Sequence, residues 1–382
     1  MKILYFAPLN DISGYANAAR QTLVALKRAG ADVSTLACKF DQYFVANTEE
    51  VDALHIEARP RTQQEFVKAI DDNDADILLN HLTPDVSALD TRKFNVIINS
   101  WETDRISPEW VSLLNKMHLC IVTCHDNIEA YRKSGVTIPV EFMPVPCDPS
   151  FYTNQYPCAL TELNNYRVKF YSIAQISPKK NIGNLLYAYL TEFSGTTDVV
   201  LVLKAYISVM AQNNDLEHIK SMVRNVKENL KLKHFPPVMI VAEPYTDEQM
   251  AGLHQACDIF VLPSRGEGWN MPAFDAVSFG KTPVVTNAGG FKEYINETNG
   301  YPVSADLVPI YGMKHPVPYL YTSEEKWAEP RVSELMQQMR FAYNDVVSGD
   351  TGNFRASKVR AGTAIPQQFS YEKIGPELLS LI

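Results

Sequence analysis

The sequence predicts an α/β protein of two domains, each built on a parallel β-sheet between helices. Three observations support this fold class. The chain has 382 residues, which is enough for two domains of ordinary size. Short apolar runs typical of buried parallel strands alternate with amphipathic helical patterns in both halves. Many of these runs end in polar or glycine-containing loops, and open α/β sheets bind ligands at that end.

The composition excludes several classes of protein. A net charge of −9 argues against a general nucleic-acid binder, whose affinity depends on neutralising phosphates. No apolar run approaches the length of a membrane span, and the first residues become polar too early for a signal peptide, so we expect a cytoplasmic protein. The six cysteines are scattered and form no zinc motif, so we expect reduced thiols and no metal.

The first half opens with a strand, a helix and a second strand, predicted over residues 2–7, 16–28 and 33–37. Gly14 stands at the first strand-to-helix turn. The three-glycine fingerprint of dinucleotide-binding domains is absent, which disfavours a dehydrogenase. Three further strand-like runs, over residues 75–81, 95–100 and 119–124, are each followed by polar or aromatic side chains. These side chains are the candidates for an acceptor cleft: His81, Trp101, Glu102, Asp104, Arg105 and His125.

A proline-rich segment, residues 139–149, indicates the end of the first domain, with a hinge between about residues 149 and 168. Residues 168–174 predict the first strand of the second domain, and Lys180 lies in the loop that follows it. Later strands are predicted over residues 199–203 and 238–242, with Glu243 and Tyr245 in the loop after the second of these.

The helix predicted over residues 214–234 carries one basic stripe. Its members, at helical spacing, are Lys220, Arg224, Lys227 and Lys231. We interpret this stripe as the solvated face of an ordinary amphipathic helix. The alternative is a docking face for an anionic acceptor or a membrane surface.

Residues 258–290 are the most informative stretch. The short apolar run 259–262 predicts a buried strand, and Pro272 suits the first turn of the helix that follows, so that Gly268 to Met271 form the loop. The free N–H groups at a helix start suit a phosphate. Glu267 and Asp275 are expected to face one crevice as hydrogen-bond acceptors for hydroxyls. A second strand, 282–286, leads to a glycine loop at 287–290, and residues 300–327 are expected to form a long irregular excursion before a helix over 332–347.

The order of these motifs resembles the nucleotide-sugar site of retaining glycosyltransferases of the GT-B fold, the group 1 type, similar to glycosyltransferase family 4. The family signature is a Glu, seven residues and a second Glu, placed after a strand that ends in Pro-Ser; Pro263, Ser264 and Glu267 match it. The second acid is Asp275 here, which shortens the side chain by one methylene. The resemblance implies two Rossmann-like domains facing across a cleft. They cover residues 1–165 on the acceptor side and 166–365 on the nucleotide-sugar side, and residues 366–382 form a helix that crosses back to the first domain.

The resemblance also implies site roles. Lys180 matches a family lysine that neutralises the donor diphosphate, whereas Gln175 occupies the position of a family arginine, for which Lys179 or Lys204 could compensate. Glu267 would hold the donor sugar and Asp275 the ribose, which makes Glu267 and Lys180 the catalytic candidates. Family members carry a histidine near Trp101, and His81 and His125 are the possible substitutes. The donor-binding candidates are Gly14, Gln175, Lys180, Glu243, Tyr245, Gly268, Trp269, Asn270, Met271 and Asp275.

The implied reaction moves a hexosyl or pentosyl group from a nucleotide-diphosphate sugar, of the UDP or GDP type, to an acceptor hydroxyl with retention of configuration and without a metal or cofactor. The acceptor would be a glycan, a lipid-linked sugar or another hydroxyl compound, and the acidic chain disfavours a nucleic-acid acceptor. Two alternatives stay open. One is a non-catalytic, degenerate protein that binds nucleotide, and the other is an epimerase or phosphorylase of the same fold.

Overall fold

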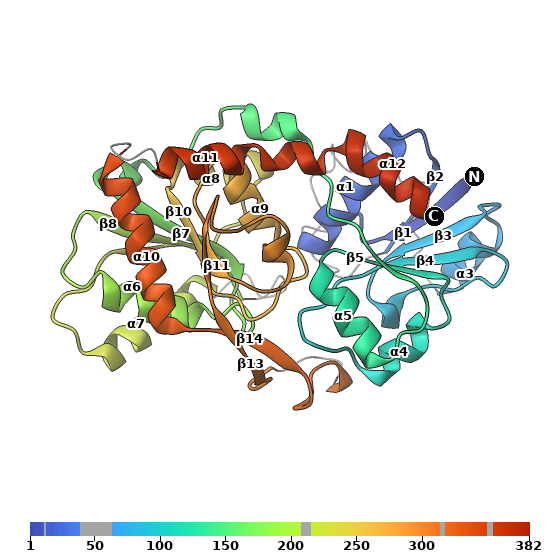
Figure 1. The fold of residues 1–382 in the computed structure, drawn as a ribbon, viewed down its shortest axis with the longest axis horizontal. Helices are drawn as coiled ribbons and strands as arrows, with labels where there is room; N and C mark the ends of the chain where they lie inside the picture. Colours follow the sequence, from blue (N-terminus) through green and yellow to red (C-terminus); the bar gives the residue numbers. More distant parts are fainter. Residues whose placement is uncertain (11–12, 39–62, 208–214, 314–317, 350–353) are drawn as a thin grey trace. The chain divides into compact units, whose positions relative to one another are not determined.

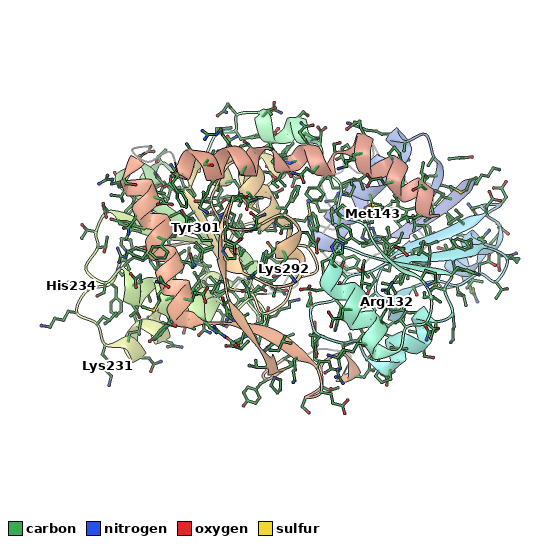
Figure 2. The ribbon with its side chains drawn as sticks, viewed as in Figure 1. Arg132, Met143, Lys231, His234, Lys292 and Tyr301 are labelled. Atoms are coloured by element: carbon green, nitrogen blue, oxygen red, sulfur yellow. The ribbon has the colours of Figure 1, made fainter. Side chains whose placement is uncertain are left out.

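The computed structural model describes residues 1–10, 13–38, 63–207, 215–313, 318–349 and 354–382 (Figure 1), and Figure 2 shows their side chains. The chain divides into two compact units. The first unit comprises Met1–Asp148, His315–Glu325 and Gln367–Ile382, and the second comprises Pro149–Lys314 and Lys326–Pro366. None of the helices within the described residues has the length and apolar character needed to cross a bilayer.

The first unit contains a six-stranded sheet in the order β2-β1-β3-β4-β5-β6, and all its neighbouring strands are parallel. Its strands are β1 (Lys2–Ala7), β2 (Asp32–Ala37), β3 (Ile77–His81), β4 (Phe94–Ile98), β5 (Leu119–Val122) and β6 (Val140–Phe142). The strand order reverses between β1 and β3, so this unit has its topological switch point there. Open parallel sheets bind ligands at such points.

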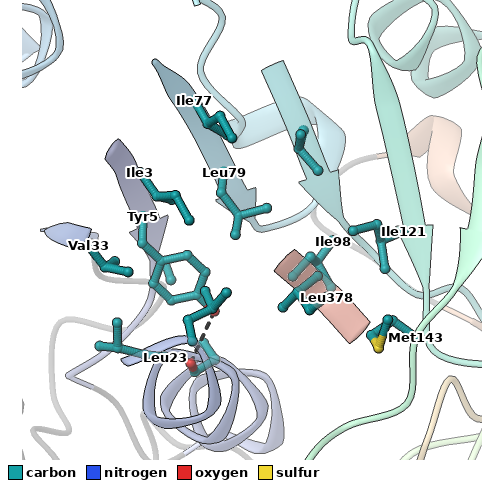
Figure 3. Packing of buried hydrophobic residues seen from close by; sticks show 14 of the residues in the cluster. Ile3, Tyr5, Leu23, Val33, Ile77, Leu79, Ile98, Ile121, Met143 and Leu378 are labelled. Atoms are coloured by element: carbon teal, nitrogen blue, oxygen red, sulfur yellow. Dashed lines mark hydrogen bonds between the residues drawn. The ribbon is translucent and has the colours of Figure 1, made fainter. Parts of the chain in front are cut away.

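Helices cover the faces of this sheet: α1 (Gly14–Arg28), α3 (Gln63–Asp71), α4 (Pro108–Leu114), α5 (His125–Ser134) and α12 (Tyr371–Leu381). The C-terminal α12 packs closely on α1, because a Cβ at Gly375 would lie 2.4 Å from the carbonyl oxygen of Ala25. Figure 3 shows Leu378 of α12 beside Ile98 of the sheet, within a core that also contains Leu23 of α1. The two ends of the chain thus share one hydrophobic core.

The second unit is built in the same way, on a six-stranded sheet in the order β12-β11-β10-β7-β8-β9. Its strands are β7 (Val168–Gln175), β8 (Val199–Tyr206), β9 (Val238–Val241), β10 (Ile259–Leu262), β11 (Val284–Thr286) and β12 (Tyr301–Val303). Its helices are α6 (Ile182–Glu192), α7 (Asp215–Leu230), α8 (Asp247–Ala256), α9 (Met271–Ser278), α10 (Val332–Val347) and α11 (Phe354–Thr363). The switch point lies between β7 and β10, whose loops carry Lys180 and Glu267.

The prediction of one long irregular excursion over residues 300–327 is wrong in part. β12 joins the main sheet, and β13 (Ala305–Pro309) pairs antiparallel with β14 (Lys326–Pro330). These strands are short, interrupted by prolines, and paired with partners distant in the sequence, so no local pattern reveals them. Between β13 and β14, Leu320 joins a core cluster of the first unit and is 4% exposed.

The basic stripe on α7 lies at the surface. The side chains of Lys220 and Arg224 are exposed, and Lys220 pairs with Glu217 of the same helix at 2.8 Å. Lys227 lies over the ring of Phe235, while Lys231 and His234 lie at the outer edge of the second unit (Figure 2). Exposed helix pairs of this kind contribute little to stability.

Candidate active site

The loops after β7 and β10 bring Lys180 and Glu267 together at the switch point of the second unit. The two strands are hydrogen-bonded neighbours, so their loops leave the sheet at the same edge. The Lys180 ammonium donates to both carboxylate oxygens of Glu267, at 2.6 and 2.8 Å. The side chains are 18% and 6% exposed, respectively, so the pair is largely removed from water while the lysine keeps a path to solvent.

Hydrogen bonds to the backbone of Lys179 connect these two loops. The amide of Arg265 donates to the carbonyl of Lys179 at 2.8 Å, and the hydroxyl of Ser264 donates to the same carbonyl at 3.2 Å. The serine of the Pro-Ser motif therefore fixes the loop that carries Lys180.

The glycine loop after β11 contacts the backbone of the β10 loop. The amide of Gly290 donates to the carbonyl of Glu267 at 2.9 Å. Gly289 has φ +58°, and a Cβ there would lie 2.4 Å from that same carbonyl oxygen. A Cβ at Gly290 would lie 2.4 Å from the carbonyl oxygen of Gly268. Only glycine permits so close an approach of two backbones, so this motif positions Glu267 by contact.

The start of α9 is held by the residues predicted to bind the donor. Asn270, at φ 74°, caps the helix by accepting from the amide of Ala273 at 2.9 Å. The hydroxyl of Tyr294 donates to the carbonyls of Trp269 and Asn270. Trp269 is 6% exposed and packs on Phe274 and Tyr294. The Trp269 and Asn270 side chains thus shape the loop at the start of α9.

Asp275, one turn into α9, has a different partner from Glu267. It accepts a hydrogen bond from the hydroxyl of Tyr152 at 2.8 Å. Burial raises the pKa of Asp275 to about 7, and the bond from Tyr152 opposes this rise. No local pattern connects Tyr152 with this acid, because 123 residues separate them.

The other donor-side candidates lie at the carboxyl edge of the sheet. Gln175, the last residue of β7, is exposed, and its amide donates to the carbonyl of Ile207 at 3.1 Å. Glu243 is exposed in the loop after β9. Tyr245, in the same loop, lies with its ring centroid 5.3 Å from the ammonium of Lys204.

A polar cluster around Glu329 of β14, not predicted from the sequence, connects the loops after β7 and β10. Glu329 accepts from the guanidinium of Arg265 and from the amides of Asn181 and Asn184, the last two at 3.3 and 3.1 Å. Arg265 also lies over the ring of Trp327, 4.8 Å from its centroid. No local pattern indicates a pairing between residues 64 positions apart, such as Arg265 and Glu329.

In the first unit, Gly14 and His81 both lie at the switch point between β1 and β3. Gly14 opens α1 behind the capping Ser13, and open space surrounds the position of its missing Cβ. His81 is 3% exposed, and its Nδ1 lies 2.7 Å from the hydroxyl of Tyr5. Burial lowers the pKa of His81 to about 3, so this imidazole is neutral at physiological pH.

The remaining acceptor candidates contact different neighbours. Trp101 is 6% exposed, stacks on Tyr321 and packs on the edge of Trp110. Glu102 accepts from the hydroxyl of Tyr321 at 2.8 Å. The other three have separate surroundings: Asp104 pairs with Lys133 at 3.6 Å, the Nε of Arg105 is buried with no hydrogen-bond partner among the described residues, and His125 stacks on Phe142. Tyr321 thus covers the ring of Trp101, one of the candidates for the acceptor cleft.

The described residues contain no group of three or more His, Cys, Asp or Glu side chains that could hold a metal ion.

The two parallel sheets define an architecture shared with solved glycosyltransferases. HepE from Anabaena, solved in complex with UDP and glucose, is similar over 100% of this chain and 99% of its own, with a TM-score of 0.69 and 17% identity. Sucrose-phosphate synthase from Thermosynechococcus elongatus is similar over 100% of this chain and 98% of its own, with a TM-score of 0.68 and 16% identity. The predicted GT-B fold is thereby confirmed.

Residues 161–306, which include Lys180, Glu267 and Asp275, match the family model described as glycosyl transferases group 1. The serotype-specific mannosyltransferase WbdA of Escherichia coli is 24% identical over 172 residues, a match that covers 45% of this chain and 20% of WbdA. The chain thus aligns with about a fifth of the length of this relative. The resemblance to group 1 glycosyltransferases is therefore confirmed, and the second unit carries the family segment.

Proposed function

We propose that this chain transfers a sugar from a nucleotide-diphosphate sugar to an acceptor hydroxyl, with retention of the anomeric configuration. The observation that carries the proposal is the Lys180–Glu267 pair at the switch point. It lies within the segment that matches the group 1 family. HepE, which shares the fold, was solved with UDP and glucose.

The charges of the pair suit the two halves of a nucleotide sugar. A lysine ammonium has three N–H donors, and Glu267 engages it through two carboxylate oxygens, which leaves a donor for a phosphate oxygen. As the bond between the sugar and the diphosphate breaks, negative charge grows on the phosphate. Lys180 and the backbone N–H groups at the start of α9 stabilise that charge. The Glu267 carboxylate accepts from hydroxyls of the donor sugar and orients the ring.

Retention follows if the acceptor attacks the face from which the diphosphate leaves. The bond between the anomeric carbon and the phosphate oxygen breaks, and a bond from that carbon to the acceptor oxygen forms on the same side. The departing phosphate oxygen takes the proton of the acceptor hydroxyl, so the step balances without a base supplied by the protein. In this scheme the donor is of the UDP or GDP type, Asp275 holds the ribose, and no metal is needed.

The proposal is tested first by binding. Thermal shift measurements with UDP, GDP, ADP and CDP are expected to show one selective stabilisation, since a ligand at 100 times its Kd adds about 2.7 kcal/mol to folding stability. Lys180→Met combined with Glu267→Gln is the appropriate negative control, because the double variant leaves no buried charge unpaired. Absence of a shift with every nucleotide would overturn the proposal.

A turnover assay then distinguishes a glycosyltransferase from a non-catalytic nucleotide-binding protein and from an epimerase. The selected nucleotide sugars are incubated with octyl glucoside and octyl mannoside as model acceptors, and free nucleoside diphosphate and glycoside are quantified. An NMR spectrum showing a glycoside with the donor's anomeric configuration supports the proposal. Binding without turnover on any acceptor indicates a non-catalytic protein. An isomerised nucleotide sugar indicates an epimerase, and both results contradict the proposed reaction.

A further inference from the structure

Three cations surround one carboxylate at the amino-terminal edge of the second sheet. Asp258 directly precedes β10, the central one of three neighbouring parallel strands. Lys169 lies at the start of β7 on one side of it, and Lys281 lies shortly before β11 on the other side. Arg355, in the first turn of α11, completes the group. We call these four residues the amino-edge cluster.

The ion pairs of the amino-edge cluster leave most of its N–H donors unused. The Lys169 ammonium and the Arg355 guanidinium each lie 3.7 Å from an oxygen of Asp258, which is longer than a hydrogen bond. Within the described part of the chain, neither group donates a hydrogen bond, and the Nε of Arg355 is buried without a partner. Asp258 instead accepts from the backbone amide of Lys169 at 2.9 Å. Lys281 donates to the carbonyl of Gln255 at 3.0 Å.

The amino-edge cluster carries a surplus of positive charge in surroundings with limited water. The side chains of Lys169, Arg355 and Asp258 are 18%, 28% and 20% exposed, respectively. Burial lowers the pKa of Lys281, Asp258 raises it, and Arg355 and Lys169 lower it again, so the four charges act on one another. Grouping like charges away from water is costly unless a counter-ion joins them. An anion bound among the three cations would offset this cost.

Two further charges at this edge have partners of their own. Lys358 of α11 donates to the carbonyls of Glu297 and Gly300. Asp345 of α10 accepts from the hydroxyl of Tyr301. Burial lowers the pKa of Lys358, and Asp345 raises it, so this cation and this acid act mainly on each other. The surplus of positive charge therefore stays with the amino-edge cluster.

We propose that the amino-edge cluster binds a phosphate group of a small soluble molecule, at a site separate from the candidate active site. The planar guanidinium of Arg355 offers paired N–H donors that match two phosphate oxygens, and the lysine ammonium groups add charge and further donors. The partial burial of these groups favours a small anion over a flat bilayer surface.

The amino-edge cluster lies far from the loops that carry the proposed donor contacts. Lys169 and Gln175 are six residues apart in β7, which corresponds to about 20 Å of strand. Lys180 and Glu267 follow the opposite, carboxyl ends of β7 and β10. The two sites therefore do not compete for one ligand, and this inference does not rest on the proposed function.

The test follows hydrogen exchange in α11 and at the start of β7 during titration with inorganic phosphate. A bound phosphate connects Arg355 of α11 to Lys169 of β7, so exchange in both segments is expected to slow until the site is saturated, which gives a Kd. The titration is made in the wild type and in Lys180→Met combined with Glu267→Gln, so that phosphate at the candidate active site does not contribute. Sodium chloride of equal ionic strength controls for screening.

Substitutions in the amino-edge cluster are expected to change the Kd for phosphate in opposite directions. Arg355→Met should raise it about tenfold or more, and Arg355→Lys should restore it in part, because the charge stays while the paired donors are lost. Lys169→Met should raise it several-fold. Asp258→Asn should lower it, because the opposing charge is removed while an amide oxygen remains for the backbone of Lys169. Lys233→Met, an exposed change of equal charge elsewhere in the second unit, should leave it unchanged.

The other outcomes overturn the inference. The first is the absence of a saturable effect of phosphate, or an equal effect of chloride. The second is an unchanged Kd in Arg355→Met, or an unchanged or higher Kd in Asp258→Asn, because either result would leave the four residues a purely structural role. Vesicles of phosphatidylcholine with and without phosphatidic acid distinguish the sources of phosphate, and protection by the phosphatidic acid vesicles alone would overturn the soluble ligand. No outcome depends on nucleotide binding, so the proposed function is tested separately.

Discussion

Breaking the Lys180–Glu267 pair from one side is expected to destabilise the second unit strongly. The Glu267 side chain is 6% exposed and accepts from one ammonium through both oxygens, at 2.6 and 2.8 Å. Lys180→Met leaves that carboxylate buried without its counter-ion, and losses of this kind cost about 3–5 kcal/mol. Because Lys180 keeps 18% of its side chain exposed, water reaches the orphaned carboxylate, and we expect the lower end, about 3 kcal/mol. Adding Glu267→Gln removes the orphaned charge and should bring the cost to about 1 kcal/mol.

A second ion pair between the same two strands provides a matched control. Lys169 at the other end of β7 pairs with Asp258 at 3.7 Å, and its side chain is also 18% exposed. Asp258 retains the amide of Lys169 at 2.9 Å and Arg355 at 3.7 Å after the lysine side chain is removed. Lys169→Met is therefore expected to cost less than about 1 kcal/mol.

Hydrogen exchange of peptides from β7 and β10 is the suitable assay. A chain of two units is not expected to unfold in one step, whereas exchange reports the opening of these strands directly. The measurement is made without nucleotide, so that stability is separated from binding. The reasoning is refuted if Lys180→Met costs no more than Lys169→Met. It is also refuted if the double variant is as unstable as the sum of its single variants, since coupled residues must deviate from additivity.

Three further predictions concern the surroundings of the candidate site. Gly290→Ala places a Cβ 2.4 Å from the carbonyl oxygen of Gly268 and should cost at least about 2 kcal/mol, measured by hydrogen exchange of the second unit. Gly183→Ala in α6, with nothing within 4 Å of its Cβ, should stabilise by about 0.5–1 kcal/mol. Equal effects of the two changes would contradict the backbone contact at Gly290. Burial raises the pKa of Asp275 from 3.8 to about 7, so folding favours its protonated form. This contribution to the free energy of unfolding is fully present below about pH 4 and is lost as the pH rises to about 7, at up to about 1.4 kcal/mol per pH unit. Asp275→Asn should therefore reduce the slope of unfolding free energy against pH between about pH 4 and 7, and an unchanged slope would refute this. Tyr321→Ala uncovers Trp101, which stacks on it at 5.1 Å, so the tryptophan emission should move to longer wavelength; an unchanged spectrum would show that the ring was not covered.

Most individual elements of the fold were predictable because their signals are local. The apolar run at residues 259–262 is β10 (Ile259–Leu262), and the amphipathic pattern at 332–347 is α10 (Val332–Val347). The β13–β14 hairpin was missed because each strand is five residues long and its partner lies beyond a stretch that packs in the first unit. Pairing of this kind is decided by sequence-distant contacts, which no local pattern encodes.

The candidate site likewise combines residues that the sequence predicted with contacts that only the structure shows. The resemblance predicted a phosphate contact for Lys180 and a sugar contact for Glu267, and so assigned the two side chains to different parts of the donor. The structure pairs them, because β7 and β10 are neighbours at the point where the strand order reverses. The contacts of Asp275 and Trp101 could not be predicted from the sequence either, because Tyr152 and Tyr321 come from distant parts of the chain.

The sequence by itself determined the α/β class, the strand ends that carry the polar loops and the family whose motifs those loops resemble. These properties depend on hydrophobic periodicity, on turn residues and on short spacings, all of which are local in the sequence. Only the tertiary structure decided which charges are paired and which acid is buried. A charge's environment depends on burial and on side chains brought close by folding, and for Lys204 that environment consists of a ring 41 residues away and a sheet edge built from separate strands.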